Sequence, residues 1–351
     1  ENVLLEIARQ IDRDRWEVFL LATQSRDRRL VPEWREIVDH VYDLERLEPL
    51  GRVPGMLYSM ALNWGFDALV LQNSLAAYSA LPAIREKRPS IHVVDILHAV
   101  DDNWDFFSAT LDVADCLARR VVISQAGRER LLAMNTPEQA IRLIPNGVDL
   151  TRFDPAQYDP LAVRRHGGIP RKASVVAFVG RLDRVKRPLL LVEVARELGR
   201  QAPERQVILA VAGDGPEEEP LISRIGATRM DRKFKMLGHV DEPEDVYAGA
   251  DVLVSTSEAE GVPLAILESL AMRTPVVAIR AGAIEEALPE DCGLLVDPRD
   301  PQAIGEAIGW ILEHPEAAEA MGRRGRHAVL DRFNWEREAA GLIRFYEGVL
   351  R

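Results

Sequence analysis

Two glutamates at the start of an expected helix have a spacing suited to ligand chemistry. Glu260 lies in a polar loop after an apolar strand pattern, and Glu268 lies one or two turns inside the helical pattern that follows. The backbone N–H groups of Gly261, Val262 and Leu264 would be exposed at the helix start, an arrangement typical of a diphosphate site. Because carboxylates accept hydrogen bonds from vicinal hydroxyls, one glutamate is suited to a sugar and the other to a ribose. A glutamate pair alone is more often a helix cap, here Glu260, and a surface carboxylate, here Glu268, than a ligand site.

A basic loop follows the first apolar run of the C-terminal half. Gly180 permits a close turn there, and Arg181 and Lys186, five positions apart, are suited to contacting two phosphates. Gly213 lies in a similar turn after the next apolar run. Solvated charge and an ordinary turn are the alternatives. Neither loop has the spacing of a Walker P-loop or a G-x-G-x-x-G fingerprint, so the sequence does not indicate an ATP or NAD site.

His98 is a third candidate, because it directly follows the apolar run at 92–97. Open α/β sheets bind ligands beyond the carboxyl ends of their strands, and the polar and aromatic residues after His98 suit contact with a sugar. A lone histidine is more often structural than functional, so both interpretations stay open.

Composition narrows the classes of function. The net charge of the 351 residues is −12, shared equally between 1–150 and the rest, so neither half is a basic nucleic-acid module. Basic runs at 26–29 and 85–88 are expected to be solvated surface, with contact to an anionic membrane as the alternative. Two distant cysteines give no metal-ligand spacing, so we expect neither a metal nor a disulfide. Without an apolar run of ~18 residues or a leader pattern, we expect a cytoplasmic protein, with contact to the inner membrane face as an addition.

Apolar β-branched runs alternate with amphipathic patterns along the chain, which predicts parallel sheets covered by helices on both faces. The expected strands lie at 18–22, 68–71, 92–97, 121–123, 141–144, 175–179, 207–211, 234–237, 252–255, 276–279 and 293–296. A turn-rich segment at 145–149 separates two series. We therefore predict two doubly wound Rossmann-like domains, 1–150 completed by a helix over 333–351, and 151–332. A helical pattern begins at residue 1, so the first strand and Gly-rich turn of such a domain are expected to be missing.

The order and spacing of these segments resemble glycosyltransferase family 4. The resemblance rests on 178–186, 213–217, 237–240 and, above all, 260–268 followed by 274–277. Residues 146–149 are similar to that family's interdomain segment. The resemblance implies a GT-B fold, with two domains facing across a cleft, and metal-independent transfer with retention of anomeric configuration.

The resemblance also implies roles for individual residues. Glu260 would contact the donor sugar, His98 would contact it near the reacting carbon, and Glu268 would hold the ribose hydroxyls. Arg181 and Lys186 would neutralise the diphosphate. The expected donor site is completed by Gly213, Val240, Gly261, Val262 and Leu264. Pro263 stands where many relatives have glycine, which removes one N–H donor.

These features predict a retaining glycosyltransferase that uses a nucleotide-diphosphate sugar and no cofactor, in the synthesis of a polysaccharide, glycolipid or glycoconjugate. The C-terminal domain would bind the donor and the N-terminal domain the acceptor. Two alternatives stay open: a nucleotide-sugar 2-epimerase on the same fold, and a non-catalytic domain that only binds a nucleotide sugar. The acceptor classes that stay open are lipid-linked, polysaccharide and small-molecule.

Overall fold

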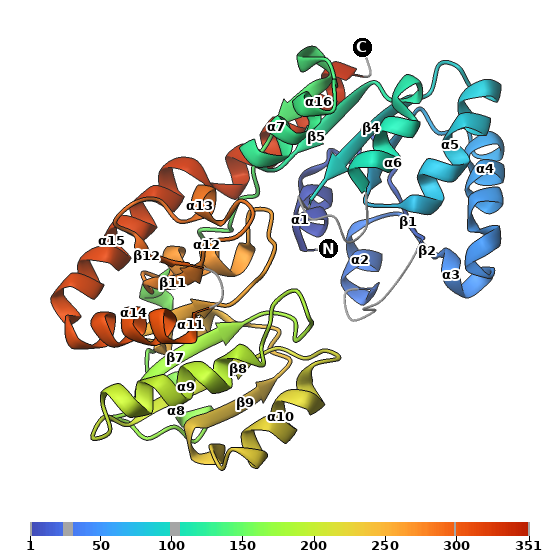
Figure 1. Ribbon diagram of the computed structural model, residues 1–351. Coiled ribbons are helices and arrows are strands. Elements are labelled where there is room, and N and C mark those ends of the chain that lie inside the picture. The colour runs from blue at the N-terminus through green and yellow to red at the C-terminus, as the bar shows by residue number, and fades with distance from the viewer. Residues whose placement is uncertain (1, 24–30, 99–105, 298–299, 350–351) are drawn as a thin grey trace. The chain divides into compact units, whose positions relative to one another are not determined.

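The structure is a computed structural model (Figure 1) that describes residues 2–23, 31–98, 106–297 and 300–349. The basic run at 26–29 and the residues directly after His98 lie outside the described residues, and so do the expectations placed on them. The chain divides into two compact units, unit 1 with residues 1–146 and 336–351, and unit 2 with residues 147–335. The chain therefore crosses between the units after residue 146 and again after residue 335.

Unit 2 is built on a six-stranded parallel sheet with the strand order β12-β11-β10-β7-β8-β9. Its strands are β7 (Ser174–Val179), β8 (Val207–Ala212), β9 (Phe234–Gly238), β10 (Val252–Ser255), β11 (Val276–Ile279) and β12 (Gly293–Val296). The chain runs outward from β7 to β9, returns to β10 on the other side of β7, and runs outward again. The strand order therefore reverses between β7 and β10, and this is the point at which open α/β sheets bind ligands.

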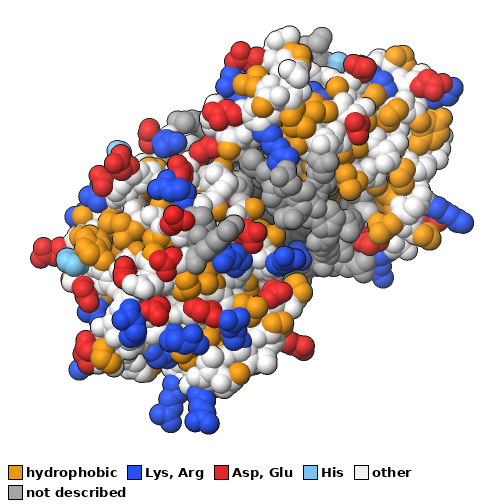
Figure 2. Space-filling view, viewed as in Figure 1, with side chains coloured by type: hydrophobic (Ala, Val, Ile, Leu, Met, Phe, Trp, Pro, Cys, Tyr) orange, Lys and Arg blue, Asp and Glu red, His pale blue; other side chains and the backbone are white. Residues whose placement is uncertain are grey.

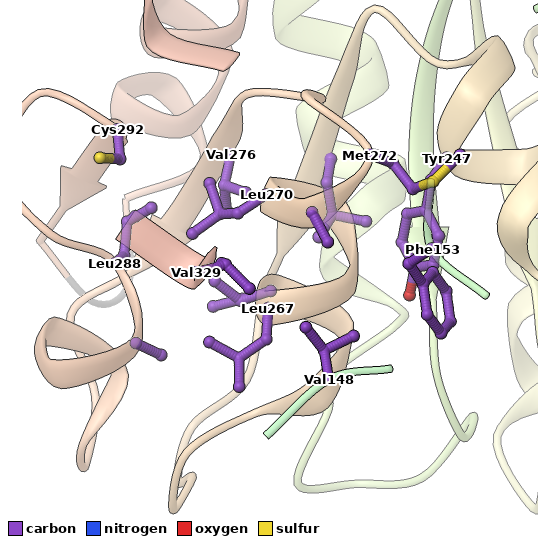
Figure 3. Packing of buried hydrophobic residues seen from close by; sticks show 14 of the residues in the cluster. Val148, Phe153, Tyr247, Leu267, Leu270, Met272, Val276, Leu288, Cys292 and Val329 are labelled. Atoms are coloured by element: carbon purple, nitrogen blue, oxygen red, sulfur yellow. The ribbon is translucent and has the colours of Figure 1, made fainter. Parts of the chain in front are cut away.

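Apolar residues cover both faces of this sheet. Val176 and Phe178 of β7 pack with the helices on one face, and Ala177 between them packs with the helices on the other. The helices are α8 (Ala162–His166), α9 (Leu190–Gln201), α10 (Glu218–Ala227), α11 (Glu244–Gly249), α12 (Leu264–Ala271), α13 (Ile284–Ala287), α14 (Pro301–Glu313) and α15 (Pro315–Arg332). Figure 3 shows the cluster in which Leu267 and Leu270 of α12 pack against neighbouring strands and helices. A strand buried on both faces is apolar throughout, which is why the apolar runs predicted these strands well.

Unit 1 has a four-stranded parallel sheet in the order β3-β4-β5-β6 and a separate two-stranded parallel sheet, β1-β2. Its strands are β1 (Phe19–Ala22), β2 (His40–Asp43), β3 (Ala68–Gln72), β4 (His92–Leu97), β5 (Arg119–Val122) and β6 (Ile141–Leu143). Its helices are α1 (Asn2–Gln10), α2 (Val31–Ile37), α3 (Leu44–Leu47), α4 (Val53–Asn63), α5 (Leu75–Lys87), α6 (Phe106–Asp112), α7 (Gln125–Ala133) and α16 (Trp335–Val349). β2 was not predicted, because only its two central residues are apolar and they are too few to form an apolar run.

The two crossings of the chain between the units lie side by side. Val148 donates its N–H to the Phe333 carbonyl at 2.9 Å, and its own carbonyl accepts from the Trp335 N–H at 3.2 Å. A Cβ on Gly147 would lie 2.6 Å from the Trp335 Cα, so only glycine fits there. The segment that the sequence marks as turn-rich is therefore paired with the junction of α15 and α16.

The face of the molecule shown in Figure 2 carries no broad field of charge of one sign. On the face shown in Figure 2, Lys and Arg side chains are interspersed with Asp and Glu side chains. The basic run at 85–88 is engaged locally, since Arg85 donates to the Ile91 carbonyl, Arg88 to the Ala61 carbonyl, and Lys87 pairs with Glu86. Among the described residues, no helix combines the length and the apolar character that crossing a membrane requires. Nor do His, Cys, Asp and Glu side chains gather there in threes, as a metal site would need.

Candidate functional site

The loops after β7 and β10 flank the point where the strand order reverses, and they carry Lys186 and Glu260. The Lys186 ammonium donates a hydrogen bond to the Glu260 carboxylate, and the two side chains are 28% and 13% exposed. Thr256 holds the loops together, because its hydroxyl donates to the Lys186 carbonyl at 2.7 Å. The structure thus brings together two residues that the sequence analysis assigned to different parts of one ligand.

This pair presents a cation and an acceptor side by side. A lysine ammonium has three donors, so Lys186 can donate to Glu260 and to an anion at once. Each glutamate oxygen has two lone pairs, so Glu260 can accept from a hydroxyl while it keeps the lysine. The arrangement suits a ligand that carries a phosphate and a hydroxyl close together.

Arg181 is the more exposed cation of the β7 loop. Its side chain is 48% exposed, and its Nε lies 3.5 Å from the Asp183 carboxylate. Asp183 also accepts from the Lys186 backbone N–H at 3.1 Å, so its carboxylate organises the turn that presents both cations. The sequence analysis overlooked Asp183, although an aspartate that accepts from a backbone N–H a few residues later is a common turn signal.

The loops after β7, β8 and β9 touch through their glycines. Gly213 has φ 142°, and a Cβ there would lie 1.9 Å from the Gly180 carbonyl oxygen, so both conformation and space require glycine. Its N–H donates to the Gly238 carbonyl at 2.7 Å. Val240, two residues after Gly238, is partly buried and packs against the hydrophobic cluster that includes residues of α11 and α12. Gly213 and Val240 therefore lie at the same carboxyl edge of the sheet as the β7 loop.

The start of α12 is defined by Pro263 and Leu264. Leu264 is the first helical residue, and Pro263 is the residue before it, not a member of the first turn. The Leu264 amide belongs to the first turn, whose N–H groups have no acceptor within the helix. Val262 is 4% exposed and packs in the core, which fixes the approach to the helix. Across the loop, a Cβ on Gly282 would lie 2.1 Å from the Glu260 carbonyl oxygen, so the chain after β11 holds Glu260 closely.

Glu268 lies in the second turn of α12 and is half-buried. The hydroxyl of Tyr247 donates to its Oε2 at 2.7 Å, and Tyr247 is fully buried. Burial raises the pKa of Glu268, while the Tyr247 hydrogen bond and the charge of Arg152 act in the opposite direction. A half-buried carboxylate with a tyrosine donor differs from the surface carboxylate that the sequence left as an alternative.

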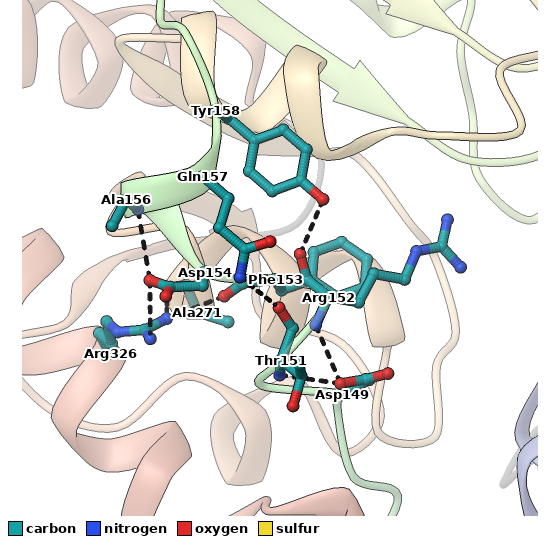
Figure 4. A network of polar contacts seen from close by, with 10 residues as sticks. All are labelled: Asp149, Thr151, Arg152, Phe153, Asp154, Ala156, Gln157, Tyr158, Ala271 and Arg326. Atoms are coloured by element: carbon teal, nitrogen blue, oxygen red, sulfur yellow. Dashed lines mark hydrogen bonds and ion pairs between the residues drawn. The ribbon is translucent and has the colours of Figure 1, made fainter.

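Arg152 and Glu244 complete this cluster. The Arg152 guanidinium donates to the Glu244 carboxylate, which is 2% exposed, and to the Asp241 carbonyl at 2.9 Å. Figure 4 shows how the segment that carries Arg152 is held. Asp149 accepts from the Arg152 backbone N–H at 3.0 Å, and the Tyr158 hydroxyl donates to the Arg152 carbonyl at 2.9 Å. Arg152, Glu244 and Tyr247 were not predicted, because nothing in their spacing marks contacts with a helix far along the chain.

His98 belongs to unit 1, directly after β4. Its Nε2 lies 2.7 Å from Oε1 of Gln72, the last residue of the neighbouring strand β3. Because the amide oxygen accepts, Nε2 carries the proton. Burial lowers the pKa of His98 to about 4, so the imidazole is neutral near pH 7. The side chain is thus held as a neutral group at the carboxyl edge of the unit 1 sheet.

Comparison with known sequences identifies relatives over most of the chain. Residues 1–152 match the family described as Glycosyltransferase Family 4, and residues 162–328 match the family described as Glycosyl transferases group 1. The D-inositol 3-phosphate glycosyltransferase of Corynebacterium urealyticum is 34% identical over 60% of this chain and 51% of the relative. That of Corynebacterium jeikeium is 32% identical over 74% of this chain and 66% of the relative. The chain thus spans about half to two thirds of the length of these curated relatives.

Solved structures share the fold at low sequence identity. Anabaena Alr3699/HepE in complex with UDP-glucose superposes with a TM-score of 0.80 at 20% identity, covering 99% of this chain and 95% of that one. Sucrose-phosphate synthase from Thermosynechococcus elongatus superposes with a TM-score of 0.77 at 21% identity, covering 98% and 92%. The fold is GT-B, with two α/β units built on parallel sheets, as predicted. Because its two units match these two families, the chain belongs to the glycosyltransferases of family 4 and group 1.

Proposed function

We propose that this protein is a retaining glycosyltransferase that moves a sugar from a nucleotide-diphosphate donor to an acceptor hydroxyl. The observation that carries the proposal is the Lys186–Glu260 pair at the strand reversal, with Glu268 in the second turn of the helix that follows. Family membership supports it, and Alr3699/HepE of the same fold is known in complex with UDP-glucose, so a UDP-sugar is the first donor to test.

The donor would lie against unit 2. Glu268 would accept the ribose hydroxyls, and Glu260 would accept a hydroxyl of the donor sugar. Lys186, Arg181 and the amides at the start of α12 would face the diphosphate. Carboxylates suit the first two tasks because they accept without donating, and the cations and helix start suit the third because they supply fixed positive charge.

Transfer would break the glycosidic C–O bond to the diphosphate, and the bonding electrons would pass to the phosphate oxygen. Lys186, Arg181 and the start of α12 would stabilise the charge that develops there. In the retaining route the acceptor hydroxyl approaches from the leaving-group face, bonds to the anomeric carbon and gives its proton to the phosphate oxygen. The neutral imidazole of His98 would contact the donor sugar near the reacting carbon without adding charge.

Unit 1 would supply the acceptor side. The curated relatives are named D-inositol 3-phosphate glycosyltransferases, so a phosphorylated polyol is one acceptor class to test beside lipid-linked and polysaccharide acceptors. Contact with a membrane surface is a separate proposal. The run at 85–88 does not favour it, because Arg85 and Arg88 already donate to nearby carbonyls.

The test is to follow donor turnover and nucleoside diphosphate binding in one set of proteins. Glu260→Gln is expected to lower turnover of the donor by about tenfold or more while the variant still binds the nucleoside diphosphate. Glu258→Gln is the matched control, because Glu258 is an exposed carboxylate in the same loop. Donor binding without any turnover by the unaltered protein, over a panel of acceptors, would favour the non-catalytic alternative. A product epimerised at the 2-position in the absence of acceptor would favour the epimerase.

A further inference from the structure

We propose that Tyr247 is a positioning residue, which holds the Glu268 carboxylate in the orientation that accepts the two hydroxyls of a ribose. The inference rests on the proposed function, because it assumes that Glu268 faces the ribose of the donor. It stands on one contact, the hydrogen bond that the Tyr247 hydroxyl donates to Glu268 Oε2 at 2.7 Å.

Tyr247 is suited to this task because its ring is fixed. The side chain is fully buried in α11, and its ring packs edge-on against Phe153, with the centroids 6.1 Å apart. Its backbone is held on both sides: its N–H donates to the Pro243 carbonyl at 3.1 Å, and its carbonyl accepts from the Thr274 hydroxyl at 2.8 Å. A ring held in this way keeps its hydroxyl oxygen at one position beside Glu268.

The contact divides the Glu268 carboxylate into two unequal oxygens. Oε2 accepts the hydrogen bond from the Tyr247 hydroxyl, whereas no hydrogen bond within the described part of the chain reaches Oε1. A vicinal diol offers two donors at a fixed separation, so it binds best to a carboxylate whose plane is already set. Holding the side chain before the ligand arrives lowers the entropy lost on binding.

The same contact helps Glu268 stay ionised. Burial raises the pKa of Glu268, and the Tyr247 hydrogen bond lowers it, as does the charge of Arg152. Glu244, at the start of α11, faces the same region and raises it. A carboxylate that lost the tyrosine would therefore take up a proton at a higher pH and would then be a poorer acceptor for hydroxyls.

The test compares UDP with 2′,3′-dideoxy-UDP and with pyrophosphate in calorimetric titrations. In Tyr247→Phe we expect UDP affinity to fall about three- to tenfold, with a larger loss at pH 6 than at pH 8. Affinity for the dideoxynucleotide and for pyrophosphate should not change. In a Glu268→Ala background, Tyr247→Phe should cause no further loss of UDP affinity, because the acceptor that it positions is gone.

Tyr158→Phe is the matched control. Its hydroxyl donates to the Arg152 carbonyl at 2.9 Å in the neighbouring segment, so the variant loses a hydrogen bond without affecting the one to Glu268. It should keep the preference for UDP over the dideoxynucleotide. The preference is the ratio of the affinity for UDP to the affinity for the dideoxynucleotide, both measured on the same preparation of a variant. A smaller folded fraction in Tyr247→Phe affects both affinities alike and does not change their ratio.

Three outcomes separate the inference from the proposed function. If the unaltered protein binds UDP and its dideoxy analogue equally well, or if Glu268→Ala changes nothing, the ribose role in the proposed function is overturned. If the ribose preference exists and depends on Glu268 but survives intact in Tyr247→Phe, the inference alone is overturned. A loss of preference in Tyr247→Phe but not in Tyr158→Phe supports both.

Discussion

Each unit holds a carboxylate that receives a hydrogen bond from a buried tyrosine, and the two pairs differ in what they leave open. In unit 1, Tyr78 donates to both oxygens of Asp95, at 2.8 and 3.0 Å, and the aspartate is fully buried in the middle of β4. In unit 2, Tyr247 reaches only one oxygen of Glu268, which is half-buried. The pair in unit 1 has no surface to offer a ligand, whereas the pair in unit 2 has an accessible side.

The electrostatics of the two pairs are alike, so they do not separate structure from function. Burial raises the pKa of Asp95 to about 6, against the hydrogen bonds from Thr110 and Tyr78 and the charge of Arg120. Burial also raises the pKa of Glu268. A raised carboxyl pKa by itself therefore marks burial, and accessibility at the carboxyl edge of a sheet is what indicates a site.

Removing the carboxylate of unit 1 should cause the largest loss of stability. Asp95→Ala leaves the Tyr78 hydroxyl without its acceptor and Arg120, which is 3% exposed, without its nearby negative charge. We expect the free energy of unfolding in urea to fall by about 3–5 kcal/mol. Asp115→Ala, at an exposed carboxylate of the same unit, is the control and should cost under ~0.5 kcal/mol. A loss below ~1 kcal/mol for Asp95→Ala would remove the structural role that we assign to it.

The pH dependence of Asp95 is the next largest effect. Its pKa is higher in the folded protein than the ordinary value of 3.8, so the folded state binds the proton more tightly. The cost of burying the ionised form of Asp95 is therefore absent below about pH 4, where the carboxyl is protonated in both states, and grows to roughly 3 kcal/mol as the pH rises through 6.

Asp95→Asn, which keeps an acceptor for Tyr78, should lack this dependence. The stability of the variant minus that of the unaltered protein should increase between pH 4 and pH 6, measured by thermal unfolding at each pH. A difference that stays flat, or that decreases, would show that Asp95 does not titrate in this range.

Glu268→Gln should give the smallest stability change, and of the opposite sign. The glutamine keeps an oxygen for Tyr247 but removes a half-buried charge whose pKa burial has raised. We expect the midpoint of thermal unfolding at pH 7 to rise by roughly 2–4 °C, and the gain to disappear at low pH, where the glutamate is itself protonated. A clear loss of stability at pH 7 would place Glu268 with Asp95, as a structural residue.

Most strands of both units could be predicted from the sequence because they read as apolar runs, and the central strands β4, β7, β8, β10 and β11 are also buried on both faces. β2 could not, because its residues HVYD begin and end with polar side chains and form no apolar run, whereas its partner β1 (FLLA) is apolar throughout. Asp95 was not singled out, although the sequence carries a signal for it: a single aspartate inside the apolar run at 92–97 must find partners when the strand is buried.

The candidate residues of the unit 2 site stand out in the sequence, but their partners in the structure do not. Glu260 and Glu268 stand out because they share one loop and helix. Lys186 meets Glu260 only through the neighbouring positions of β7 and β10, which the spacing of apolar runs does not reveal. Tyr247 has the pattern of an ordinary core residue of α11, and its hydroxyl contact depends on how α11 and α12 pack.

The central claim is that Glu260 and Glu268 serve different parts of one donor, and it is tested most directly by titrating Glu260→Gln and Glu268→Gln with UDP beside an assay of UDP-sugar turnover. Glu268→Gln should weaken UDP binding by about tenfold or more, because the ribose belongs to the free nucleotide as well as to the donor. Glu260→Gln should bind UDP as the unaltered protein does and lose turnover, because its contact is made only with the sugar. Equal loss of UDP affinity in the two variants would contradict the claim.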